Sequence, residues 1–86
     1  MFYVYFLKSL NTNFRYIGYT SNLRMRLKQH NDGENKSAKP YLPFELDAYV
    51  AVATEEKAKK LEKYFKTGSG ITFAGKRILT YVASAQ

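Results

Sequence analysis

Five side chains in this sequence are of types that could act together on a phosphate ester. Tyr5 and Tyr16 lie in apolar stretches typical of strands, Arg26 and His30 lie four residues apart in an amphipathic segment, and Glu62 lies on the inward edge of a second such segment. An arginine can hold a phosphate through two hydrogen bonds, and a single carboxylate suits Mg²⁺ or Mn²⁺, which keep most of their waters and also bind phosphate oxygens. A tyrosine, with an ordinary pKa of about 10, becomes a base where nearby cations favour its phenolate. The set therefore predicts hydrolysis of a phosphodiester bond assisted by one divalent cation on Glu62.

Each of these side chains also has a plainer interpretation. Two tyrosines in strands can be core aromatics with hydrogen-bonded hydroxyl groups. The arginine can be a solvated charge on a basic helix, and the histidine can simply end that helix with its ring nitrogens satisfied. Glu62 can pair with Lys66 at i+4 or with Lys59 at i−3. The spacing of the whole set, rather than any one member, favours a site.

Two apolar segments at the start of the chain predict a hairpin that carries the tyrosines. Residues 2–7 are apolar on both faces, as in a central strand, and residues 14–19 read as the returning strand after a turn at 11–13. A turn centred near residues 10 and 11 would place Tyr5 directly opposite Tyr16. Gly18 leaves room for the close approach of a backbone or a ligand where the second strand ends.

The segment after the hairpin has the spacing of an amphipathic helix. Thr20 or Ser21 is expected to cap it, two leucines form its buried stripe, and Arg26 and His30 flank that stripe. Further basic residues are predicted to contact nucleic acid: Arg24, Lys28, Lys36 and Lys39.

The second half of the chain predicts a strand and a helix. Alternating apolar residues at 44–52 indicate a strand with one buried face. Thr54 is expected to cap the helix that carries Glu62, and Gly68 to close it. A short helix is expected around 71–74.

Length and composition indicate one small basic domain. The chain has 86 residues, a net charge of +7, a pI near 9.7 and no cysteine. Nucleic acid is the first partner that this charge suggests, although a soluble protein with a lysine-coated surface has the same composition. The absence of cysteine excludes a disulfide framework and a thiolate zinc site, and no segment resembles a signal peptide or membrane span, so we expect a cytoplasmic protein. We assign residues 1–75 to the domain and 76–86 to a tail, with a possible extra strand at 77–82.

The motifs together resemble those of the GIY-YIG nuclease domain. The resemblance rests on Tyr3-Val4-Tyr5, on Tyr16-Ile17-Gly18, on the R-x-x-x-H spacing of Arg26 and His30, and on the inward Glu62. It covers residues 2–75, including the run Lys66-Thr67-Gly68-Ser69-Gly70, and is strongest to the small members that consist of little else. Tyr3 stands where the motif's name has glycine.

The resemblance implies a small α+β fold, a three-stranded antiparallel sheet flanked by helices, and cleavage of nucleic acid with one metal ion. It implies that Tyr5 and Tyr16 act as the base or its support. It also implies that Arg26 binds the scissile phosphate and that Glu62 binds the metal.

Three functions are consistent with the sequence. The first is an endonuclease that cuts DNA with Mg²⁺ or Mn²⁺. The second is a binding module for DNA or RNA without turnover, in which tyrosines stack on bases and basic residues follow the backbone. The third is a domain that docks on another protein and lends it affinity for DNA.

Overall fold

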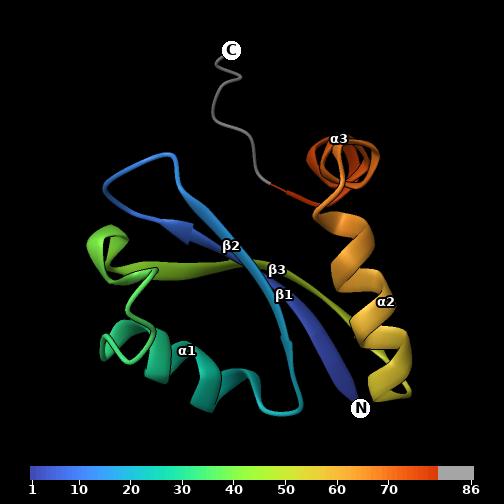
Figure 1. Ribbon diagram of the computed structural model, residues 1–86, viewed down its shortest axis with the longest axis horizontal. Coiled ribbons are helices and arrows are strands. Elements are labelled where there is room, and N and C mark those ends of the chain that lie inside the picture. Colours follow the sequence, from blue (N-terminus) through green and yellow to red (C-terminus); the bar gives the residue numbers. More distant parts are fainter. Residues whose placement is uncertain (80–86) are drawn as a thin grey trace.

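The computed structural model describes residues 1–79 as a three-stranded antiparallel sheet with helices on both faces (Figure 1). This confirms the α+β fold expected from the sequence. The helix α1 lies on one face, and α2 and α3 lie on the other. In chain order the elements are β1 (Phe2–Ser9), β2 (Arg15–Thr20), α1 (Leu23–Asn31), the 3₁₀ helix η1 (Lys39–Tyr41), β3 (Phe44–Val52), α2 (Glu55–Phe65) and α3 (Gly68–Arg77).

The central strand β1 divides the core into two clusters. The strand order is β2-β1-β3, so β1 is paired on both edges and covered on both faces. Val4 and Phe6 pack toward α2 and α3, whereas Tyr5 and Leu7 pack on the side of α1. The continuous apolar run of residues 2–7 predicted this position correctly, because only a strand covered on both sides has no polar face.

The hairpin register differs from the expected one by two residues. Tyr5 lies opposite Gly18, and Tyr16 lies opposite Leu7. The connection spans residues 10–14, longer than a tight turn, and buried Ser9 organises it: its Oγ accepts hydrogen bonds from two backbone N–H groups of the turn. Because the shift is an even number, Tyr5 and Tyr16 still share a face of the sheet.

The third strand changes its buried face partway along. The register with β1 shifts between Phe6 and Leu7, which leaves Asp47 as an extra residue on β3. Phe44 therefore packs on the α1 side, while Ala48 packs toward α2. The bounds of the strand were predicted correctly, but its single buried face was not, and Leu46 is exposed.

The helices α2 and α3 meet at a short corner. Thr54 caps α2 as expected, but Gly68 begins α3 instead of closing α2, and Thr67 is the cap of α3. A Cβ on Gly70 would lie 1.9 Å from the backbone oxygen of Tyr64, so this glycine lets the two helices approach.

The third helix, α3, is longer than the short helix expected at residues 71–74. It runs through Arg77, so the strand expected at 77–82 does not begin there. Residues 78 and 79 are not in a strand either, and residues 80–86, which include the rest of the predicted strand and tail, lie outside the described residues. No helix among residues 1–79 is long and apolar enough to cross a membrane.

Candidate nuclease site

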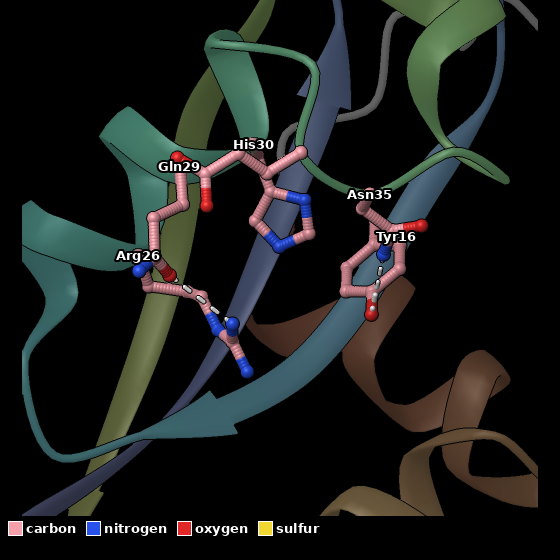
Figure 2. A pocket seen from close by; sticks show the side chains of 6 residues that line it. Tyr16, Arg26, Gln29, His30 and Asn35 are labelled. Atoms are coloured by element: carbon pink, nitrogen blue, oxygen red, sulfur yellow. Dashed lines mark hydrogen bonds between the residues drawn. The ribbon is translucent and has the colours of Figure 1, made fainter.

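A cleft of about 220 Å³ opens between α1, β2 and the loop that follows α1 (Figure 2). Its walls carry three predicted site residues, Tyr16, Arg26 and His30. They reach it from different elements, because Tyr16 comes from β2 and the other two from the face of α1 that borders the sheet. Gln29, Glu34 and Asn35 complete the lining.

Tyr5 lies behind this wall as part of an aromatic cluster. The rings of Tyr5 and Tyr16 are nearly parallel, with centroids 6.3 Å apart, and the centroid of the His30 ring is 4.5 Å from that of Tyr16. The Tyr5 hydroxyl is hydrogen-bonded to Nε2 of His30 at 3.1 Å. The structure thus brings together two tyrosines, a histidine and an arginine that the sequence places up to 25 residues apart.

Gly18 makes room for the tyrosine side chains, whereas a backbone or a ligand was expected to approach it. A Cβ at this position would lie 2.6 Å from Oη of Tyr5 and 3.1 Å from Cε1 of Tyr16. Any side chain here would therefore displace Tyr5 from its place over β2. The bulky Tyr3 does not have to compete for this space, since its ring packs edge-on against Tyr49 of β3 at 5.7 Å.

Burial determines the protonation of Tyr5. The side chain is only 2% exposed. Burial, followed by the charge of Tyr16, raises the pKa of Tyr5 to about 12, and the Arg26 guanidinium opposes this only in part. The expectation that nearby cations would lower the pKa is therefore wrong for Tyr5, which keeps its proton at neutral pH.

His30 is buried and neutral. It is 4% exposed, and burial, followed by the charge of Arg26, lowers its pKa. Its Nδ1 has no hydrogen-bond partner among the described residues. A neutral, buried imidazole holds Tyr5 through Nε2, and it would not attract a phosphate as an imidazolium would.

Arg26 is a cation that lines the cleft. Its side chain is exposed, and Nη1 donates a hydrogen bond of 3.2 Å to Oε1 of Gln29, one turn along α1. Figure 2 shows the His30 ring between Arg26 and Tyr16. Asn22 caps this helix through Met25 N–H, whereas Thr20 or Ser21 was expected. The cap fixes the start of the helix from which Arg26 projects.

Glu62 stands apart from the cleft. It does not line the cavity. Its side chain is 20% exposed and forms an ion pair with Lys66, in which Oε2 of Glu62 lies 2.6 Å from Nζ of the lysine. This is the pairing that the plainer interpretation of Glu62 anticipated. Its charge still acts on the site: burial is the largest cause of the raised pKa of Tyr5, and the Glu62 carboxylate adds a smaller contribution in the same direction.

The donors of the site suit only certain metal ions. Among residues 1–79, no group of three or more His, Asp or Glu side chains could hold a metal ion. One carboxylate fits Mg²⁺ or Mn²⁺, for which water and substrate phosphate complete the coordination. To hold such an ion, the Glu62 carboxylate would have to contact both the cation and Lys66, or its ion pair with Lys66 would have to break.

The predicted nucleic-acid contacts lie around α1 and the following loop. Arg24 and Lys36 are exposed, and Lys28 pairs with Asp32 at 2.7 Å. Lys39 lies in η1, with its stem over Gly33. All four lie on the segment from α1 to η1, which borders the cleft. Their role as phosphate contacts stays a prediction.

Reasoning from the sequence missed three lining residues. It gave no role to Gln29, Glu34 or Asn35, which all line the cavity. For Gln29, the spacing of three residues from Arg26 was a usable signal. Glu34 and Asn35 lie in a loop, where local sequence does not show which way a side chain points.

A comparison with known protein families identifies the family of this chain. The family model described as the GIY-YIG catalytic domain matches residues 1–71. The chain belongs to the GIY-YIG family. The match covers the sheet, α1 and α2, and with them all five predicted site residues.

Relatives of this GIY-YIG chain occur among bacterial proteins of a group called UPF0213. A UPF0213 protein of Bacillus licheniformis is 42% identical over 52 residues, which are 59% of this chain and 54% of that protein. The UPF0213 protein YazA of Bacillus subtilis is 36% identical over 63 residues, 72% of this chain and 64% of YazA. This chain thus spans less than two thirds of the relatives it matches. No solved structure matches it.

Proposed function

We propose that this GIY-YIG domain is an endonuclease that hydrolyses phosphodiester bonds in DNA with one divalent cation and a tyrosine base. The observation that carries the proposal is the shared cleft of Tyr16, Arg26 and His30, with Tyr5 hydrogen-bonded behind it. The family match supports a nuclease, and the net charge of +7 supports a polyanionic substrate.

The exposure and surroundings of each residue of the cleft indicate its role. Arg26 is exposed and oriented by Gln29, so it can bind the scissile phosphate and stabilise the charge that grows on it. Tyr16 lines the cavity, and its phenolate would accept a proton from the attacking water. Tyr5 keeps its proton and, with His30, supports the ring of Tyr16 from behind.

Glu62 is the residue that would hold the cation. A bound Mg²⁺ or Mn²⁺ supplies positive charge to the phosphate and the leaving oxygen. Glu62 lies on α2, on the other face of the sheet from α1, and outside the cavity that Arg26 lines.

Replacing Glu62 by glutamine tests this proposal. Nicking of supercoiled plasmid with Mn²⁺ should be abolished in E62Q, while DNA affinity stays nearly unchanged, because the acid contributes no attraction to phosphate. The matched control is E56Q, since Glu56 lies on the same helix and pairs with Lys60 at the exposed side. Undiminished cutting by E62Q would remove the metal role from this residue.

A second function, a module that binds DNA or RNA without cutting, is favoured by one observation. Glu62 is paired with Lys66 and lies outside the cleft, whose lining combines Arg26 with aromatic and amide side chains and with Glu34. Both functions predict salt-sensitive binding, so affinity does not separate them. Nicking assays on plasmid, single-stranded and branched DNA do, because the binding module would leave every substrate intact.

A further inference from the structure

The loop after α1 places an amide against the tyrosine of the cleft. Nδ2 of Asn35 donates a hydrogen bond to Oη of Tyr16 at 3.2 Å (Figure 2). Both side chains line the same cavity, although they are 19 residues apart in the chain. The bond therefore acts on a tyrosine that lines the cavity in which a phosphate would bind.

The orientation of this amide is fixed by its neighbours. Oδ1 of Asn35 accepts hydrogen bonds from the backbone N–H of Ser37 at 3.1 Å and from Ser37 Oγ at 2.8 Å. A backbone N–H can only donate, so the oxygen of the amide must face Ser37 and its nitrogen must face Tyr16.

The loop itself is anchored in the core. The N–H of Ala38 donates to the carbonyl oxygen of Asn35 at 3.1 Å, which closes a turn. Ala38 is buried in the cluster that contains Tyr5 and Leu7. The donor is thus held in place before any substrate arrives, as a group that orients a reacting oxygen must be.

We propose that Asn35, held by Ser37, is a positioning residue that orients the oxygen of Tyr16 and stabilises negative charge on it. The role rests on the proposed function, in which Tyr16 accepts the proton of the attacking water. The amide N–H donates to the phenol oxygen of a side chain that also lines the cavity.

Replacing Asn35 by leucine removes the donor at nearly constant side-chain size. N35L should lower kcat for plasmid nicking about tenfold or more with little change in KM, and should move the pH–rate profile to higher pH. S37A keeps the Asn35 donor but removes the hydrogen bond from Ser37 Oγ, one of the two that orient the amide, so a smaller loss of kcat is expected. N13L, in the exposed hairpin turn, is the control and should cut like the wild type. A kcat and pH profile of N35L equal to those of the wild type would overturn the proposal.

A second measurement does not depend on cutting. The ¹³Cζ resonance of Tyr16 at neutral pH reports hydrogen bonding to its oxygen and should shift in N35L but not in N13L. If the wild type cuts no substrate while the resonance shifts, the nuclease function fails and the Asn35–Tyr16 contact stands. An unchanged resonance would refute the contact, and with it the positioning role.

Discussion

Gly18 is the residue on which the packing of the site depends most directly, and its replacement by alanine has a calculable effect. The added Cβ would lie 2.6 Å from Oη and 2.8 Å from Cζ of Tyr5, both shorter than real side chains tolerate. Tyr5 is 2% exposed and bonded to His30, so its ring cannot retreat into solvent. Overpacking of this kind costs about 1–3 kcal/mol. In a domain of this size each kcal/mol lowers Tm by about 4–8 °C.

Urea unfolding followed by circular dichroism measures this cost. We expect G18A to lose about 2 kcal/mol of unfolding free energy, the middle of the overpacking range. The matched control is G68A at the first residue of α3, where an added Cβ meets nothing within 4 Å. That variant should stay within about 0.5 kcal/mol of the wild type. Equal stability of the two variants would refute the close packing of Tyr5 over β2.

Two further predictions concern charge. Replacing Lys66 by methionine frees the Glu62 carboxylate from an ion pair of 2.6 Å. Because the lysine is half exposed, the pair contributes at most about 1 kcal/mol. K66M should therefore bind Mn²⁺ up to about fivefold more tightly, as measured by electron paramagnetic resonance. Weaker binding would contradict the role of Glu62. Burial, then the charge of Arg26, lowers the pKa of His30, so the unfolded chain takes up the proton more readily and stability should fall as pH drops below about 6.5. Urea midpoints measured from about pH 8 to pH 5 should show a smaller slope in H30Q than in the wild type, and identical slopes would count against a neutral buried histidine.

The sequence predicted the elements well because their signals are local. The apolar run of residues 2–7 marked a strand covered on both faces, and β3 has the predicted bounds. The hairpin register was wrong by two residues because buried Ser9 organises a longer turn. The change of buried face at Asp47 had no signal in the alternation of residues. The third helix was underestimated because two glycines, normally helix breakers, lie in its first turn.

The sequence predicted which residues belong to the site better than it predicted their burial and contacts. Residue types and spacing identified Tyr16, Arg26 and His30, which do share a cleft. The burial that keeps Tyr5 protonated depends on Gly18 and α1 together, and no stretch of sequence shows it. The contact of Asn35 with Tyr16 depends on a loop conformation, and the pairing of Glu62 with Lys66 on a choice between two possible lysine partners.

The two tyrosines are the most direct test of how the cleft works. Plasmid nicking with Mn²⁺ should be compared for the wild type, Y16F and Y5F, with folding of each variant checked by circular dichroism. We predict that the wild type nicks, that Y16F is slower by about a hundredfold or more, and that folded Y5F retains more activity than Y16F, because Tyr5 lies behind the cleft with its pKa raised to about 12. Wild-type rates in Y16F, or a folded Y5F more impaired than Y16F, would contradict the assignment of the base to the tyrosine that lines the cleft.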